Sequence, residues 1–162
     1  MSVNLSVKQF SQPNLISQID DILSLTELDG SSLNLEITES AIMDNAKSAT
    51  SLLKEIRSRR IQLSIDDFGT GYSSLSYLHR FPINTLKIDR SFVKRIGVNG
   101  ENIGIVQAIV TLADNLGMDV VAEGVETAHQ LAQLKYVGGR LVSGENDSWV
   151  LEPRSLTAVL PL

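Results

Sequence analysis

The chain has 162 residues, of which 43% are apolar and 20% charged, and its formal net charge at pH 7 is -5; these values are typical of one globular domain and exclude a disordered chain. It contains no cysteine, which excludes disulfides, thiolate metal sites and cysteine nucleophiles and is typical of the reducing cytoplasm. The acidic balance argues against nucleic-acid polymers as partners, and the apolar runs are too short to predict a membrane span.

Strand and helix patterns alternate along the chain. Six segments have the apolar or alternating pattern of strands: 3–6, 33–38, 61–65, 85–89, 119–122 and 141–143. Helices are predicted after Pro13, over 45–60, before Pro82, from Ile103 to Gly117 and after Thr127. Gly117 suits a left-handed helix end, and Thr127 can cap the helix that follows it.

Strands that alternate with helices indicate parallel pairing, because a parallel crossover needs about a dozen residues and is usually a helix. Two architectures have this pattern: an open doubly wound sheet, and a barrel whose functional residues come from the ends of many strands. Polar residues fall within or at the carboxyl ends of five predicted strands: Asn4, Glu36, Asp66 with Asp67, Lys87 and Glu123. Polar groups on so many strands favour the barrel.

A complete barrel of eight strand-helix units usually needs about 250 residues. The sequence accounts for about six of these units, and the first predicted strand begins almost at Met1. We therefore expect an α/β fold that is an incomplete TIM-like (β/α) barrel, with the amino-terminal units missing. Such a barrel has open sheet edges, so we expect a homo-oligomer or a complementing chain.

Asp66 and Asp67 are the most informative pair of residues. Two adjacent carboxylates repel each other and share a site when a positive charge lies beside them. Together with Glu36, Glu123 and the Asn4 carbonyl oxygen, they form a set of oxygen ligands that suits Mg2+ or Mn2+ rather than zinc. The alternative is that the two aspartates only begin a turn.

Lys87 also has two interpretations. It can pair structurally with an acid, or it can stabilise an attacking hydroxide or the charge of a phosphoryl group.

The glycines of 69–71 match a phosphate loop only weakly, because the third small residue of a dinucleotide-binding motif is absent, and they are better interpreted as a hinge that positions the aspartates. Three other residues are expected to be surface or packing residues: His79, His129 and Trp149.

Five segments occur in the order and spacing of one known family: 2–10, 35–40, 66–75, 86–92 and 121–127. The third reads DDFGTGYSSL, and the last contains AEGVET. On these motifs the chain resembles the carboxyl-terminal two-thirds of an EAL domain, the family of cyclic-di-GMP-specific phosphodiesterases. The resemblance is clear over 1–138 of a single domain that spans 1–162, and 139–162 diverge from the family pattern.

The resemblance implies a barrel with one reversed strand, and two Mg2+ or Mn2+ ions that activate a water to open cyclic-di-GMP to linear pGpG. The roles that it implies are metal binding by Asn4, Glu36, Asp66 and Asp67, action on the attacking water by Lys87, and a ligand or general-base role for Glu123. Around them, it implies that Glu39 supports the glycine loop and that Glu126 and Ser143 lie on the substrate side.

Two departures from the family pattern bear on activity. The Glu-Ala-Leu segment, whose glutamate is a metal ligand in the family, is absent from the sequence, and Ser143 stands where the family has a glutamine. Three hypotheses remain: a cyclic-di-GMP phosphodiesterase that is truncated and has reduced or no activity alone, a non-catalytic module of bacterial second-messenger signalling that binds cyclic-di-GMP or a protein, and a degenerate product without activity.

Overall fold

A computed structural model describes residues 1–43, 46–71, 75–97, 103–138, 140–143 and 149–152. The strands of this part of the chain form one sheet: β1 (Ser2–Leu5), β2 (Asn34–Thr38), β3 (Gln62–Phe68), β4 (Thr85–Ile88), β5 (Asp119–Ala122), β6 (Arg140–Ser143) and β7 (Trp149–Glu152). Their order across the sheet is β1-β2-β3-β4-β5-β7-β6, and β1 to β5 are parallel.

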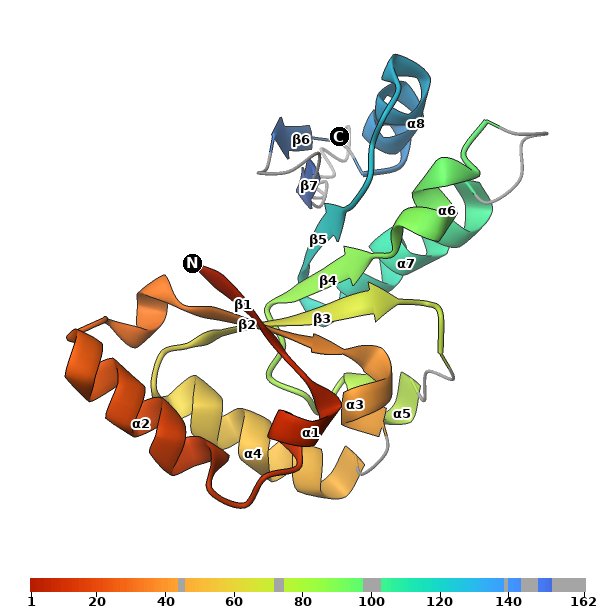
Figure 1. Cartoon of the computed structure of the whole chain (residues 1–162). Coiled ribbons are helices and arrows are strands. Elements are labelled where there is room, and N and C mark those ends of the chain that lie inside the picture. The colour runs from red at the N-terminus through yellow and green to blue at the C-terminus, as the bar shows by residue number, and fades with distance from the viewer. Residues whose placement is uncertain (44–45, 72–74, 98–102, 139, 144–148, 153–162) are drawn as a thin grey trace, which may run out of the picture.

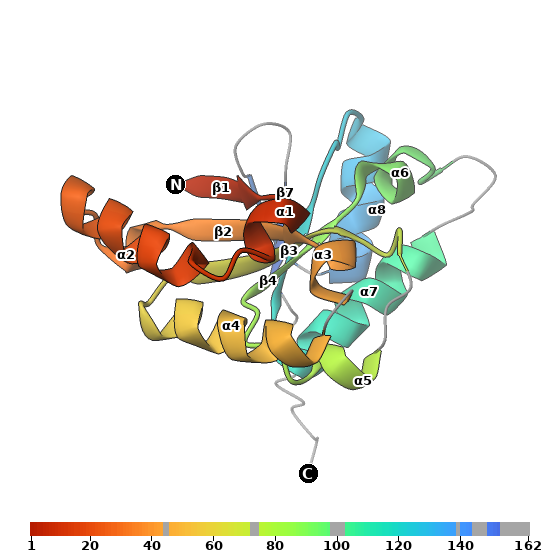
Figure 2. The same cartoon turned by 60° about the horizontal axis from the view of Figure 1, so that its bottom comes forward.

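The helices connect these strands in the alternating manner that the sequence predicts. Their bounds are α1 (Val7–Phe10), α2 (Leu15–Thr26), the 3-10 helix η1 (Gly30–Ser32), α3 (Glu39–Met43), α4 (Ala46–Ser58), α5 (Leu75–Leu78), α6 (Arg90–Lys94), α7 (Ile103–Leu116) and α8 (Ala128–Gly138). The helices α2, α4 and α7 lie along the same face of the sheet (Figures 1 and 2), with α4 against β3 and α7 against β4 and β5.

The order of the parallel strands decides between the two architectures. From β1 to β5 the spatial order follows the chain order, without a reversal among these described strands. A doubly wound sheet has such a reversal, whereas a barrel adds its strands in sequence. The parallel part of the sheet therefore has the arrangement of a (β/α) barrel.

The carboxyl-terminal strands differ from the prediction, which ended at 141–143. A further strand, β7, pairs antiparallel with both β5 and β6 and so separates them. Only residues 144–148 connect β6 to β7, which is too few for the crossover that parallel neighbours need. The prediction of parallel pairing is therefore wrong at this end of the sheet. The predicted polar loop over 144–148 itself lies outside the described residues.

Side chains along the parallel strands alternate between the helix-covered face and the opposite face. On β2, Leu35 and Ile37 are buried, whereas Glu36 between them is partly exposed. Lys87 has the corresponding place on β4. The largest fully buried side chains are those of Ile37, Ile42, Leu53, Ile56, Ile61, Leu63, Ile65, Leu78, Leu86, Ile88 and Leu134. The apolar core thus occupies one face and leaves the other to polar residues.

β3 contains a bulge opposite β4. The pairing register shifts between Ile65 and Phe68, so that Asp66 and Asp67 together oppose Lys87. Asp67 has a positive φ of 53°, which is uncommon for a residue other than glycine. The strand was predicted to end at Ile65, but it continues through the bulge to Phe68. The bulge interrupts the usual alternation and re-aims the two aspartates.

Helix ends follow local signals in the sequence. Gly117 has a φ of 68° at the end of α7, and Thr127 Oγ1 accepts a hydrogen bond from the Gln130 N–H (3.2 Å) at the start of α8, as predicted. The short helices α1, α3 and α6 were not predicted, because four or five residues are too few to show a helical period. Both α1 and α6 begin at a side chain that accepts a backbone N–H, Ser6 and Asp89 respectively.

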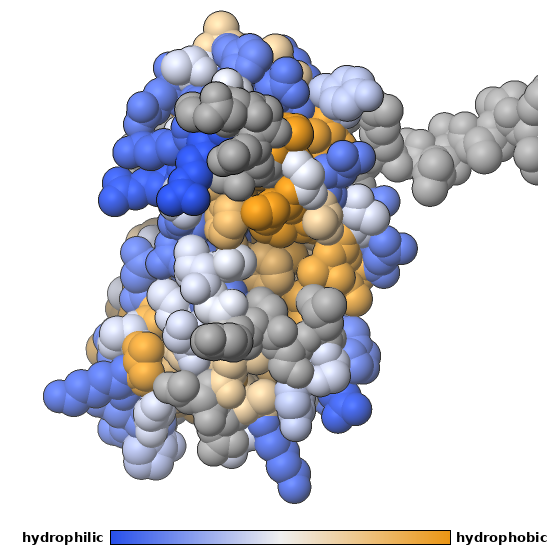
Figure 3. Space-filling view, turned by 90° about the vertical axis from the view of Figure 1, so that its right-hand side faces the viewer, coloured by the Kyte–Doolittle hydropathy of each residue, from blue (hydrophilic) through white to orange (hydrophobic). Residues whose placement is uncertain are grey.

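Part of the surface is apolar. Large apolar side chains are exposed at Met1, Val3, Val7, Ile22, Leu25, Tyr77, Ile105 and Tyr136. Figure 3 shows a face on which apolar residues gather in the middle, between hydrophilic areas. Among the described helices, none has both the length and the apolar character that crossing a membrane requires.

Truncating a core leucine tests the packing of α4 on the sheet. Leu53→Ala is expected to lower the free energy of unfolding by about 3 kcal/mol, because the side chain is fully buried and a cavity would remain. The matched control is Leu25→Ala on α2, where the exposed side chain should change stability by less than about 0.5 kcal/mol. Urea denaturation measures both, and equal effects would contradict this packing.

Candidate active site

The side chain of Lys87 lies among three carboxylates from neighbouring strands. Its Nζ atom is 2.6 Å from Glu36 Oε2, 2.7 Å from Glu123 Oε1 and 3.3 Å from Asp66 Oδ1. The side chains of Lys87 and Glu36 are each 12% exposed, whereas that of Glu123 is 33% exposed. The structure therefore brings four of the predicted site residues into one ion cluster, and Glu123 is its most accessible carboxylate.

The sheet assembles this cluster from distant parts of the chain. Glu36 lies on β2 and Asp66 at the bulge of β3, while Glu123 directly follows β5. The Glu123 N–H donates to the carbonyl oxygen of Ile88 at the end of β4 (3.4 Å). Because β2 to β5 are parallel neighbours, their carboxyl ends lie on the same side of the sheet.

The ion pairs set the charge of Lys87. Burial alone would lower the pKa of its amine, but the hydrogen bonds to Glu123 and Glu36 and the charge of Asp66 outweigh burial and raise the pKa above its usual value. The amine is therefore protonated at neutral pH. In that state it donates hydrogen bonds and stabilises negative charge, and it cannot act as a general base.

Asp67 and Asp89 form a second acidic pair beside this cluster. Burial raises the pKa of Asp67, and the neighbouring carboxylates of Asp66 and Asp89 raise it further. For Asp89, burial acts in the same direction, but hydrogen bonds from the hydroxyl and the backbone N–H of Ser91 outweigh it and lower the pKa. The neighbouring aspartates thus have pKa values shifted in opposite directions, upward for Asp67 and downward for Asp89.

Glu39 contacts the glycine loop that follows β3. The Glu39 side chain is buried, and its Oε2 accepts a hydrogen bond from the Gly69 N–H (3.0 Å). Gly69 has a φ of 96°, and a Cβ there would lie 3.0 Å from the Phe92 ring. A Cβ on Gly71 would lie 3.4 Å from the Glu39 carboxyl carbon. The positive φ and the close approach to Phe92 therefore favour glycine at position 69, and Gly71 lies in contact with the Glu39 carboxyl group.

The other predicted site residues lie around the ion cluster. Asn4, on β1, is exposed and pairs in register with Glu36 on the neighbouring strand. Glu126 is exposed, and its carboxylate lies 3.9 Å from the amine of Lys94. Ser143 is the last residue of β6, where only its backbone is described.

The chemistry of this site fits a hard divalent cation. Its donors are carboxylate oxygens, and the three carboxylates around Lys87 outnumber its single positive charge, with Asp67 and Asp89 adjacent. Over the described ranges, however, no three acidic or histidine side chains are placed to hold a metal ion among themselves. The Lys87 ammonium occupies the space between the carboxylates.

Asp89 is the residue of this site that the sequence interpretation missed. It lies two positions after Lys87, and a strand period of two predicts that both point to the same face. Its spacing from Ser91 is also that of a helix cap, and its side chain accepts the Ser91 N–H (2.9 Å). These two spacings are the signals by which the sequence could have revealed it.

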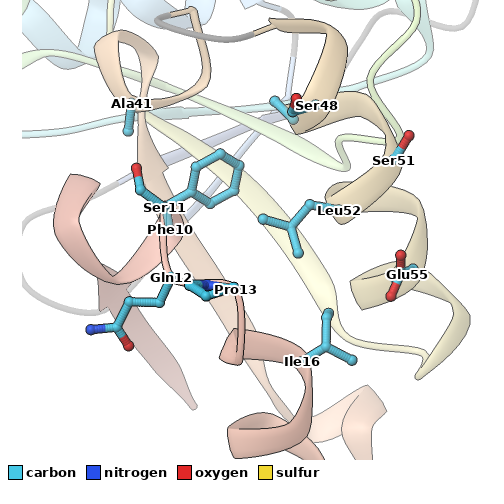
Figure 4. Close-up of a pocket in the computed structure, with 11 residues that line it drawn as sticks. Phe10, Ser11, Gln12, Pro13, Ile16, Ala41, Ser48, Ser51, Leu52 and Glu55 are labelled. Carbon is cyan, nitrogen blue, oxygen red and sulfur yellow. The ribbon is translucent and has the colours of Figure 1, made fainter.

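A separate groove of about 640 Å3 lies between the turn after α1, α3 and α4 (Figure 4). Phe10 and Leu52 point toward one another across it (Figure 4). The lining residues are Phe10, Ser11, Gln12, Pro13, Ile16, Ala41, Ser48, Ala49, Ser51, Leu52 and Glu55. The carboxylates of the ion cluster do not line this groove, so it is a distinct concavity.

Comparison with known proteins decides the family. A family model described as EAL domain matches residues 1–146. The chain belongs to the EAL domain family. The resemblance based on the five sequence motifs is thereby confirmed.

Relatives and solved structures of EAL proteins extend this result. The cyclic di-GMP phosphodiesterase NbdA of Pseudomonas aeruginosa is 42% identical over 144 residues, which are 89% of this chain and 18% of NbdA. The PaMucR phosphodiesterase, solved as a c-di-GMP complex, is 40% identical with a TM-score of 0.82, and the match covers 91% of this chain and 57% of that one. The manganese and c-di-GMP complex of Klebsiella pneumoniae BlrP1 is 33% identical with a TM-score of 0.74, covering 85% and 35%. The chain spans 17 to 23% of the length of the first curated relatives that it matches.

Removing the shared cation tests the ion cluster of this EAL domain. Lys87→Met is expected to lower the free energy of unfolding by about 3 kcal/mol near neutral pH, because three partly buried carboxylates lose their partner. The folded-state pKa of Lys87 is raised, so wild type retains this contribution below the unfolded pKa and loses it only as the pH rises through the folded pKa. The effect of the substitution should shrink in acid, where the carboxylates of the variant can be protonated.

Urea denaturation in EDTA, at neutral pH and in acid, measures this difference. The matched control is Lys54→Met, which removes an exposed lysine from α4 and should change stability little. Equal effects of the two substitutions, or a loss for Lys87→Met that does not depend on pH, would show that the cluster does not hold the strand ends together.

Proposed function

We propose that this chain carries an EAL-type phosphodiesterase site that hydrolyses cyclic-di-GMP to linear pGpG in the bacterial cytoplasm. The observation that carries the proposal is the cluster of Glu36, Asp66 and Glu123 around the Lys87 ammonium at adjacent strand ends. The names of NbdA and of the PaMucR complex support cyclic-di-GMP as the substrate. We assign the site to one EAL-type domain over 1–162.

Divalent metal is the proposed cofactor, either Mg2+ or Mn2+. Its proposed ligands are Asn4, Glu36, Asp66 and Asp67, whose side chains offer only oxygen donors. When bound, the metal would supply charge to the phosphoryl oxygens and lower the pKa of a water. The BlrP1 complex with manganese and c-di-GMP supports such a requirement in this family.

The residues of this chain would act on the attacking water. Hydrolysis to pGpG joins the water oxygen to phosphorus, breaks the bond to the 3′ oxygen and delivers a proton to that oxygen. The protonated Lys87 would donate hydrogen bonds to the attacking and phosphoryl oxygens and stabilise their negative charge. Glu123, the most accessible carboxylate of the cluster, would be the general base that takes the proton from the water.

Three further residues are proposed to act on the substrate side. Glu39 would keep the loop 69–71 in place through its hydrogen bond to Gly69. Glu126, exposed after Glu123, would face the nucleotide. Ser143, at the end of β6, would take the place of the glutamine of the family.

An activity assay tests the proposal directly. Conversion of cyclic-di-GMP to pGpG by the purified chain with Mn2+ is expected to be slower than conversion by a complete EAL domain, and EDTA should stop it. Asp66→Asn should lower the rate by about 100-fold or more, because it removes a charged oxygen from the metal and from Lys87. Asp114→Asn is the matched control, since it lies exposed on α7 and should leave the rate unchanged. Chromatography of the nucleotides measures the rates, and turnover that survives Asp66→Asn would refute the assigned site.

A non-catalytic module that binds cyclic-di-GMP is the second candidate. It is favoured by one observation: Lys87, rather than an open space, lies between the carboxylates, and the described residues offer no preformed group of three metal ligands. Calorimetry separates the two functions. Micromolar binding of the nucleotide without turnover would support the module. If both binding and turnover are absent, both functions are excluded.

We also propose that the barrel is incomplete, that the chain alone has reduced or no activity, and that a second copy or a complementing chain covers its edge. β1 stands at one end of the strand order and pairs with β2. The side chains of Met1 and Val3 at this edge are exposed. An edge strand presents unpaired backbone groups that favour addition of another strand.

Charging the edge strand tests its proposed pairing. The wild-type chain is expected to sediment as an oligomer in analytical ultracentrifugation, and Val3→Lys should shift it to monomer, because a lysine on an edge strand opposes strand addition. The matched control is Ile105→Lys, an exposed apolar position on α7, which should leave the association unchanged. A monomeric wild type, or dissociation by Ile105→Lys instead, would contradict the role of β1.

A further inference from the structure

The side chain of Gln130 lies in the first turn of α8, is only 6% exposed and binds the backbone of the preceding loop. Its Oε1 accepts hydrogen bonds from the N–H groups of Glu126 (2.8 Å) and Thr127 (3.0 Å). The Gln130 N–H in turn donates to Thr127 Oγ1 (3.2 Å). Thr127 and Gln130 thus form a capping box. The bond to the Glu126 N–H lies one residue outside this box, so capping of α8 does not account for it.

The loop 123–126 connects β5 to α8 and has no regular secondary structure. At its first residue, the Glu123 carboxylate contacts the Lys87 amine (2.7 Å). Gly124 has a φ of 69°, which turns the chain away from the strand direction. Val125 is buried, which fixes the depth of the loop but not the direction of its N–H groups. Gln130 fixes that direction at the far end.

We propose that Gln130 is a positioning residue for the site: by binding two successive N–H groups, it holds the loop so that Glu123 stays against Lys87 and Glu126 stays on the substrate side. The catalytic meaning of this role rests on the proposed function. The coupling between Gln130 and the ion cluster is a property of the fold and can be measured without substrate.

Two substitutions separate hydrogen bonding from packing. Gln130→Met keeps the length and the apolar stem of the side chain but removes the acceptor, which leaves two N–H groups without a partner. Gln130→Glu keeps an acceptor oxygen in the same place and should preserve both bonds. Thr127→Val removes the other half of the capping box and leaves the bond to the Glu126 N–H, so it controls for simple loss of a helix cap.

A double-mutant cycle tests the coupling by urea denaturation of Gln130→Met, Glu123→Gln and the double variant. If Gln130 holds Glu123 against Lys87, the midpoint of the double variant falls by clearly less than the sum of the two single shifts. Additive shifts would overturn the proposal. If Gln130→Met does not fold, the binding of cyclic-di-GMP by Gln130→Glu is the test instead, and a loss of binding in that variant would overturn the proposal.

Calorimetric titration with cyclic-di-GMP in Mn2+ provides the second readout. Gln130→Met should weaken binding about tenfold, as is typical when a group that orients a site residue is lost. Gln130→Glu and Thr127→Val should bind as wild type does, and a comparable loss in either variant would overturn the positioning role. If the wild type binds no nucleotide, the proposed function fails, and the double-mutant cycle alone decides the inference.

Discussion

One partly buried ammonium group, shared by carboxylates from three other segments, determines how the carboxyl end of this sheet is built. Without Lys87, the strand ends would present negative charges to one another at close range, and their repulsion would oppose parallel pairing. The cluster also depends on register, because a slip of one residue in any strand moves its side chains to the opposite face. The apolar core fixes which face is buried, and the ion cluster fixes the alignment of the strand ends.

The sequence predicts most of the parallel sheet for physical reasons that are local. Strands β1 to β5 have apolar residues at every second position, and helices with a clear apolar face, α2, α4 and α7, lie between most of them. Elements that depend on few residues or on distant partners were missed. The antiparallel strand β7 has four residues, and the extension of β3 beyond Ile65 depends on its shifted pairing with β4, which no local pattern reveals.

The candidate site was predictable in composition but not in geometry. Glu36, Asp66, Lys87 and Glu123 could be assigned to strand ends from their spacing alone. The sequence could not show that the amine lies between the carboxylates, because that arrangement depends on distances between strands. It likewise could not show that Asp66 and Asp67 together oppose Lys87, because that pairing requires the bulge. The roles proposed for these residues follow from the family resemblance.

The bulge in β3 makes the number of residues in this strand, and not only their identity, a determinant of the charge at the site. Losing one residue between Ile65 and Phe68 would restore regular alternation opposite β4. The one aspartate that remains would then lie opposite Lys87 on the polar face, and the site would have one carboxylate fewer. The loops on either side of β3 can accommodate a change of length. Within the strand, the same change would alter the number of negative charges around Lys87 at the carboxyl ends of the strands.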